Sequence, residues 1–125
     1  QVDREVFEHA KETLKNLKPD LSFVYFCGVD EAGHQHGSID APYFEAVARI
    51  DNYLKELHSI LQDSGDAWNL IVVTDHGHRD EGGHGGDSAQ ERASFVIAHG
   101  INKAHPIWPI DLQPHQLTGE ILKLI

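Results

Sequence analysis

Two polar, glycine-containing segments of this 125-residue chain carry the residue types that bind metal ions. Residues 30–37 read Asp-Glu-Ala-Gly-His-Gln-His-Gly, and residues 74–86 contain Thr-Asp-His-Gly followed by Gly-His-Gly-Gly. Five of the ten histidines fall in these segments: His34, His36, His76, His78 and His84. Carboxylates and imidazoles together suit Zn²⁺, and also Mn²⁺ or Fe. Two such ions, about 3.5–4 Å apart, can clamp the attacking and leaving oxygens of an in-line displacement.

The spacing within the two segments indicates which side chains converge. Asp30 and His34 are four residues apart on what we expect to be a tight loop, so both can reach one ion. Asp75 and His76 are adjacent at the end of a predicted strand, and the glycine that follows them permits the turn that brings both inward. His84 lies between glycines, which let the backbone approach a site closely. These five side chains are candidate metal ligands.

The pattern of apolar residues predicts the elements that position these side chains. Helical spacing predicts a helix over residues 3–17 with Asp3 as N-cap, one over 40–63 with Asp40 as N-cap, and a last helix over about 111–125. Short apolar runs predict strands at 21–27, 70–74 and 94–98, with a loop at 28–38. Because a strand-helix-strand unit gives parallel neighbours, we expect an α/β fold whose polar segments meet at the carboxyl end of a parallel sheet.

Composition limits the classes of protein that fit. A length of 125 residues with 40% hydrophobic and 24% charged residues predicts one folded domain, or a fragment of one, over 1–125. Ten basic against 20 acidic residues give a formal charge of −10. This charge argues against a basic face that binds nucleic acid or an anionic membrane. The single cysteine, Cys27, excludes an intrachain disulfide and fits a reducing compartment. No apolar run is long enough to span a membrane, and no signal peptide is visible.

The motifs, in this order, resemble those of the alkaline phosphatase superfamily, and within it the type I phosphodiesterase/nucleotide pyrophosphatase proteins. The resemblance rests on Asp-x-x-Gly-His-x-x-Gly at 30–37, Thr-Asp-His-Gly at 74–77 and Gly-His-Gly-Gly at 83–86, and it extends to segments 94–103 and 111–124. It implies an alkaline phosphatase-like fold, a parallel sheet flanked by helices, of which this chain is the C-terminal half. It also implies a hydrolase of small phosphodiester, pyrophosphate or phosphomonoester substrates that uses two divalent ions, zinc by default and manganese as the alternative.

The resemblance further implies a role for each ligand. One ion, which activates water and stabilises the leaving group, would be held by Asp30, His34 and His84, and the ion that activates the protein nucleophile by Asp75 and His76. The family takes another aspartate ligand and a Thr or Ser nucleophile from its N-terminal half, so we expect the nucleophile before Gln1 and assign no catalytic residue within the chain. The chain alone should then be inert toward phosphate esters, bind metal weakly and self-associate through an exposed sheet edge.

Several residues and functions remain as alternatives. His36 and His78 lie in the motif segments outside the ligand positions, and they are candidates for contacting the ligands or lining the pocket. His99 is a candidate for the same role. Four other histidines are expected to be solvated: His9, His58, His105 and His115. Other activities of the superfamily fit the same residues, namely sulfatase, phosphonate hydrolase and phosphomutase. A non-catalytic, histidine-rich metal-binding module is the alternative from another class.

Overall fold

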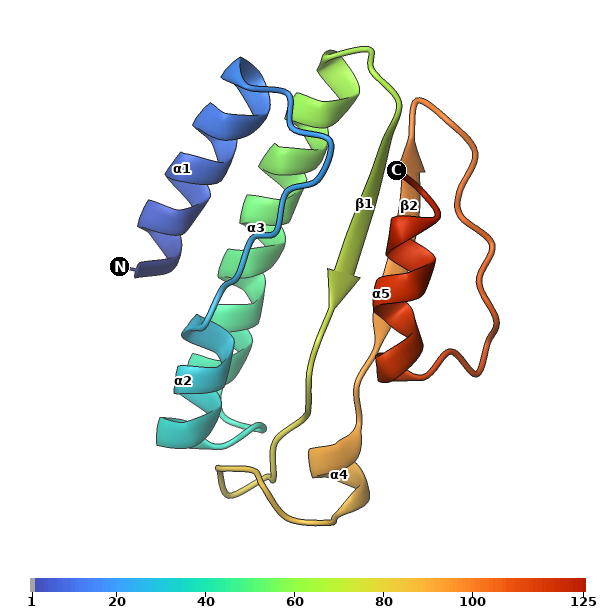
Figure 1. Ribbon diagram of the computed structural model, residues 1–125. Helices are drawn as coiled ribbons and strands as arrows, with labels where there is room; N and C mark the ends of the chain where they lie inside the picture. The colour runs from blue at the N-terminus through green and yellow to red at the C-terminus, as the bar shows by residue number, and fades with distance from the viewer. Residues whose placement is uncertain (1) are drawn as a thin grey trace.

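The computed structural model of the protein describes residues 2–125. Its elements, in chain order, are α1 (Val2–Asn16), α2 (Gly28–His36), α3 (Ala41–Asp63), β1 (Trp68–Val73), α4 (Ala89–Arg92), β2 (Val96–Ile101) and α5 (Pro114–Leu122). Figure 1 shows α1 and α3 side by side, with the sheet of β1 and β2 next to α3. No helix among these residues is both long enough and apolar enough to cross a membrane.

The main hydrophobic core lies between α1, α3 and the extended segment 21–27. Phe7 of α1 stacks on Tyr53 of α3 with ring centroids 4.3 Å apart, and Phe26 of the extended segment lies against the same tyrosine at 5.8 Å. Leu57 of α3 is buried in this cluster, and Val24 packs against it. The apolar stripe predicted for residues 40–63 therefore does bury one face of α3, which begins after Asp40 as expected.

The α/β class predicted from the sequence is confirmed, but the sheet that forms is antiparallel and has two strands among the described residues. β1 pairs with β2 from Trp68 opposite Ile101 to Val73 opposite Val96. The predicted third strand at 94–98 is thus displaced to Val96–Ile101. β2 runs antiparallel to β1 because the connection between them reverses the chain direction. The strand-helix-strand unit expected to give a parallel pair is a different one: it consists of segment 21–27, α3 and β1.

Segment 21–27 is extended but belongs to no strand ladder in the described part of the chain. It runs in the same direction as β1 (Figure 1). Its side chains alternate: Val24 and Phe26 pack on the core, whereas Leu21, Phe23 and Tyr25 are exposed, Phe23 to 86%. The apolar run therefore predicted the extended conformation correctly, while a strand also requires a hydrogen-bonded neighbour, which its own sequence does not supply.

The predicted loop at 28–38 is instead the helix α2, and its N-terminus is capped by a distant residue. Asp3 is not the N-cap of α1; it lies within that helix and is buried. Its two carboxylate oxygens accept hydrogen bonds from the backbone N–H groups of Cys27 and Gly28, both at 2.9 Å. The first N–H groups of a helix have no partner within the helix, and a carboxylate there also interacts favourably with the helix dipole. Asp3 thus fixes the start of α2.

Substitution of Asp3 tests this cap. Asp3→Ala leaves the Cys27 and Gly28 amides without acceptors and should lower the free energy of unfolding by about 1–2 kcal/mol. Urea denaturation measures the loss. Asp20→Ala, at an exposed bend, is the matched control and should change stability by less than about 0.5 kcal/mol. Equal effects of the two substitutions would contradict the assignment.

Candidate metal centre

Helix α2 presents Asp30 and His34 on one face. Residues four apart in a helix are neighbours on its surface, and His34 Nε2 lies 3.7 Å from Asp30 Oδ2. The helix ends at Gly37, whose N–H donates to the Gly33 carbonyl at 3.1 Å. The two side chains were expected to converge on a tight loop, and a helix brings them together by its i, i+4 geometry instead.

The chain that leaves β1 brings two histidines to the same carboxylate. We name residues 75–78 the His76 arm. His78 Nε2 lies 3.0 Å from Asp30 Oδ1, and His76 Nε2 lies 3.8 Å from the same oxygen. His78 is 8% exposed, and its Nδ1 is buried without a hydrogen-bond partner among residues 2–125. Its ring lies against Gly33, where an added Cβ would come within 2.7 Å of ring atoms, so the glycine of the 30–37 motif makes room for this histidine.

A glycine-rich turn, residues 82–86, brings in the fourth imidazole; we name it the His84 arm. His84 Nε2 lies 3.4 Å from Asp30 Oδ1 and 3.0 Å from His34 Nε2. Gly82 and Gly83 have φ values of 105° and 77°, a region that residues with a Cβ rarely adopt. The turn is held against α2 by a hydrogen bond from Gly83 N to the Gly33 carbonyl at 3.4 Å.

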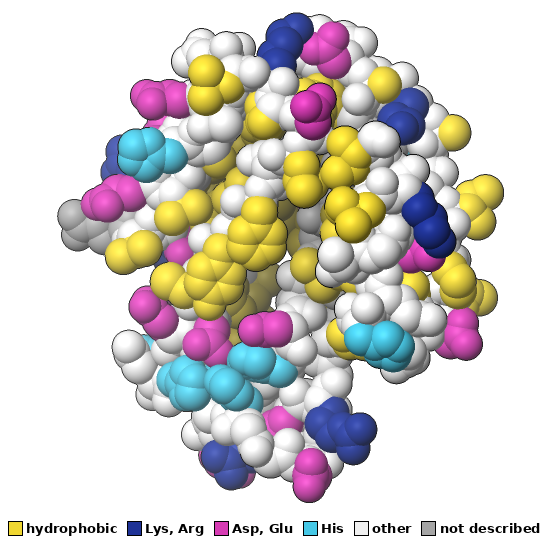
Figure 2. Space-filling model, in the orientation of Figure 1, with side chains coloured by type: hydrophobic (Ala, Val, Ile, Leu, Met, Phe, Trp, Pro, Cys, Tyr) yellow, Lys and Arg dark blue, Asp and Glu magenta, His cyan; other side chains and the backbone are white. Residues whose placement is uncertain are grey.

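Asp30 is therefore the centre of a cluster with four imidazoles from three segments. Two overlapping sets have ligand atoms close enough to share an ion: Asp30 with His34 and His84, and Asp30 with His76 and His78. Figure 2 shows acidic and histidine side chains gathered on one part of the surface, next to a band of hydrophobic side chains. Removal of the Tyr25 hydroxyl from water, and then the charges of Asp30 and Asp75, raise the pKa of this hydroxyl. Tyr25 is therefore close enough to the cluster to be affected by its carboxylates.

The residues singled out in the sequence divide into three groups. The structure brings Asp30, His34, His76 and His84 together, although not at the end of the parallel sheet that was expected, since the sheet among residues 2–125 is antiparallel. Asp75 lies at the edge: its side chain is 78% exposed, its Oδ2 is 3.5 Å from His76 Nε2, and it is in neither ligand set. The His36 side chain is exposed and has no hydrogen-bond partner among residues 2–125, whereas His78 lies inside the cluster.

A second histidine contact was missed by sequence reasoning. His58 of α3, expected to be solvated, lies with its Nε2 3.2 Å from Nε2 of His99 in β2. The ring of His105 lies 4.7 Å from that of His99, and its Nδ1 accepts a hydrogen bond from Gly100 N. His58 and His99 are 41 residues apart in the sequence, so no local pattern could have indicated their contact.

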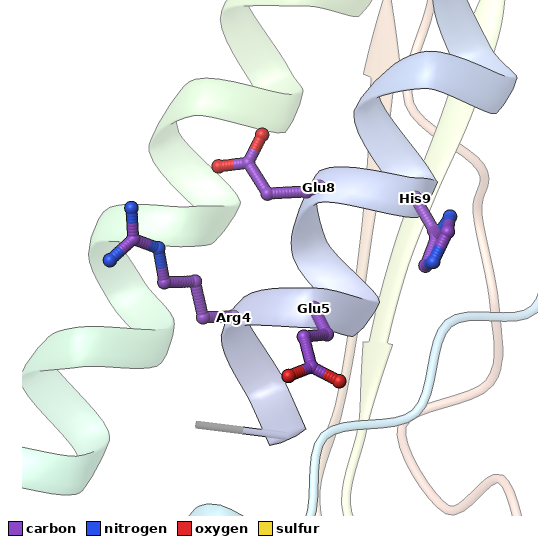
Figure 3. A pocket seen from close by; sticks show the side chains of 4 residues that line it. All are labelled: Arg4, Glu5, Glu8 and His9. Carbon is purple, nitrogen blue, oxygen red and sulfur yellow. The ribbon is translucent and has the colours of Figure 1, made fainter.

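Other polar features near the cluster and on the surface do not contribute ligands. Burial, with the nearby Asp3 and Glu31 carboxylates, raises the pKa of the Cys27 thiol, which keeps it protonated and structural. A shallow hollow on α1 is lined by Arg4, Glu5, Glu8 and His9. Figure 3 shows these side chains spreading in different directions from one helix, so they do not converge on a ligand.

Comparison with known proteins finds related sequences over most of this chain. A sequence model described as "Type I phosphodiesterase / nucleotide pyrophosphatase" matches residues 1–100. Human GPI ethanolamine phosphate transferase 3, catalytic subunit, is 29% identical over 86% of this chain and 10% of its own length. The Schizosaccharomyces pombe GPI ethanolamine phosphate transferase 3 is 33% identical over 76% of this chain and 10% of its own length. The chain thus spans about a tenth of the length of these relatives. No solved structure matches it.

Replacement of His78 tests whether it belongs to the cluster. His78→Ala removes a buried ring that contacts Asp30 and fills the space beside Gly33. In metal-free buffer this should lower the free energy of unfolding by about 1–3 kcal/mol, measured by denaturation with tryptophan fluorescence. His36→Ala on the exposed side of α2 is the control and should have little effect. A silent His78→Ala variant would show that its contact with Asp30 contributes nothing.

Proposed function

The chain belongs to the type I phosphodiesterase/nucleotide pyrophosphatase family, and from that premise we propose that it supplies the metal-binding part of an enzyme that transfers a phosphoester group between oxygen atoms. The observation that carries the proposal is the convergence of Asp30 with four imidazoles from three separate segments. Cleavage of phosphoesters by this kind of centre needs positive charge beside the phosphoryl oxygens, and the chain itself has a formal charge of −10.

The donor set fits a divalent transition metal. One carboxylate with two imidazoles is a ligand set that catalytic zinc sites use. His34 Nε2 and His84 Nε2 lie 3.0 Å apart, whereas two nitrogens on one tetrahedral zinc lie about 3.3 Å apart at ordinary bond lengths. We propose that Asp30, His34 and His84 hold one ion. A second ion would be held by His76, with Asp75 as the family resemblance implies or with His78 as the observed grouping favours.

The protein's own groups have separate tasks in this proposal. Bound divalent ions supply the charge that stabilises the phosphoryl oxygens and the leaving oxygen. Asp30 orients the imidazoles by contacts of 3.0–3.8 Å to all four rings. Of two hydroxyls beside the arms, Thr74 Oγ1 accepts from Phe95 N at 3.1 Å, and Ser88 Oγ donates to Glu91 at 2.5 Å. In this proposal neither is the nucleophile, which the family resemblance places outside these 125 residues.

Transfer to an alcohol is the reaction that the relatives favour over hydrolysis. Their names describe ethanolamine phosphate transferases, so we propose a phosphodiester donor and an alcohol acceptor. In that reaction the phosphorus–oxygen bond to the donor alcohol breaks, a phosphorus–oxygen bond to the acceptor forms, and the acceptor proton passes to the leaving alkoxide. Hydrolysis, the activity first expected, breaks the same bond with water as acceptor, and the description of the matching family favours it as the second candidate.

Segment 21–27 suggests how the fold is completed. Its outer side chains are exposed, and it runs in the same direction as β1 without pairing to any strand among residues 2–125. We propose that it becomes a strand of a parallel sheet when further strands pair with it. Without them, two copies of the chain should associate through this edge. Light scattering over a concentration series should show dimers or larger species that Phe23→Lys reduces. A strictly monomeric chain at high concentration would contradict this proposal.

Metal titration tests the centre directly. We expect zinc to bind to the unchanged chain. His34→Ala and His84→Ala should each weaken the tightest site at least tenfold, because each substitution removes one of three ligands. His115→Ala, on α5 and exposed, is the matched control and should bind as the unchanged chain does. Competition with a coloured chelator measures the affinities. If neither histidine variant differs from the control, the ligand assignment is wrong.

The reaction type needs a separate assay. The assay uses a longer polypeptide that also carries the nucleophile. This polypeptide is given a phosphoethanolamine diester with and without an alcohol acceptor. Transfer predicts that product bearing the acceptor forms in preference to free phosphoethanolamine, and that His34→Ala abolishes both. Free phosphoethanolamine as the sole product at saturating acceptor would favour the hydrolase instead.

A further inference from the structure

Glu91 is a buried carboxylate that the proposed chemistry does not use. It lies in the short helix α4 and is 6% exposed. Glutamate is rarely buried unless it is paired, because removing its charge from water is costly. Arg79 is its nearest cation, with Nε 3.7 Å from Glu91 Oε1, and hydrogen bonds provide the other contacts of the carboxylate.

These hydrogen bonds connect Glu91 to both arms of the metal centre. Its Oε1 accepts from Gly86 N, at the end of the His84 arm, at 2.9 Å. Its Oε2 accepts from Ser88 Oγ at 2.5 Å and Ser88 N at 3.4 Å. Its backbone carbonyl accepts from Gly77 N, between the two histidines of the His76 arm, at 3.0 Å. One residue therefore bonds to both segments that bring histidines to Asp30.

The fit of the His84 arm against Glu91 is close. A Cβ at Gly86 would lie 2.9 Å from one carboxylate oxygen and 3.0 Å from the other, so the glycine allows this approach. Ser88 and Glu91 also form a reciprocal capping box, since Glu91 N donates to Ser88 Oγ at 3.3 Å. The carboxylate is thus held from both sides and cannot move without releasing Gly86.

We propose that Glu91 is a positioning residue that fastens the His76 arm to the His84 arm and so sets how their imidazoles surround Asp30. It touches no group of the proposed reaction and acts through the backbone of the two arms. The inference rests on the proposed function in that the positioned groups are taken to bind metal. Groups that orient metal ligands in this way typically change metal affinity by 10–100-fold when they are replaced.

The charge state of Glu91 agrees with this role. The hydrogen bonds from Ser88 and then Gly86 lower the pKa of the Glu91 carboxyl. A carboxyl whose pKa is lower in the folded state contributes stability above its unfolded pKa and loses that contribution as the pH falls through the folded value. At neutral pH the fastening is therefore fully formed, with Arg79 as the facing charge.

Glu91→Gln is the sharpest test, because it keeps the shape but turns an amide NH₂ toward the N–H groups of Gly86 or Ser88. Glu81→Gln is the matched control: Glu81 contacts the same Arg79 at 3.9 Å, and its side chain is 74% exposed. Amide hydrogen exchange in the metal-free chain reports the fastening itself. We expect at least tenfold faster exchange at Gly86 in Glu91→Gln, whose carboxylate acceptor is lost, and a smaller increase at Gly77, whose acceptor is the retained backbone carbonyl of residue 91. Glu81→Gln should change neither.

Metal binding reports the consequence. Zinc affinity should fall 10–100-fold in Glu91→Gln, and the visible spectrum of bound Co²⁺ should change, which a loss of stability alone would not cause. If Glu91→Gln does not fold, Ser88→Ala removes the shortest bond to the carboxylate and should give the same effects at smaller size. Unchanged exchange and unchanged affinity in these variants would overturn the inference. If the unchanged chain binds no zinc, the proposed function fails, while the exchange rates still decide whether Glu91 fastens the arms.

Discussion

The contact between one carboxylate and four imidazoles is the constraint on which this structure depends. Asp30 Oδ1 and Oδ2 face rings that come from α2, from the His76 arm and from the His84 arm, at 3.0–3.8 Å. The backbone of each segment must therefore approach the others closely. Gly33 makes room for the buried ring of His78, and Gly82 and Gly83 adopt positive φ so that His84 can return to α2. The glycines of the motifs are as necessary to the cluster as its histidines.

The same constraint explains two buried carboxylates outside the cluster. Asp3 caps α2, the helix that carries Asp30 and His34, and Glu91 binds the backbone of both arms. Each acidic side chain accepts backbone N–H groups that would otherwise lack partners, which compensates for its burial. Neither residue touches an imidazole of the cluster. Geometry at the centre is thus set by hydrogen bonds to the backbone one layer away from the ligands.

Family membership and geometry together narrow the chemistry. The family handles phosphoesters, and the relatives are named as ethanolamine phosphate transferases, so transfer and hydrolysis differ here in the acceptor alone. An acidic chain has no electrostatic means of its own to hold an anionic phosphoester. A cluster that gathers one carboxylate with several imidazoles is suited to concentrating divalent charge at that point. The contact between His58 and His99 lies outside this cluster and links α3 to β2.

The sequence by itself determined the features that depend on local pattern. Periodicity predicted α1, α3 and β1 within a few residues, and motif spacing identified Asp30, His34, His76 and His84 as residues that meet. Tertiary structure decided whatever depends on a distant partner. Residues 28–36 are helical with a cap 25 residues away, segment 21–27 has no paired neighbour in the described part of the chain, and the strand pair is antiparallel. His78 joined the cluster, and Asp75 remained at its edge, because the turn after β1 decides which side chains face Asp30. Hydrogen-bond partners far apart in the chain leave no periodic signal, so these features could not be read from the sequence.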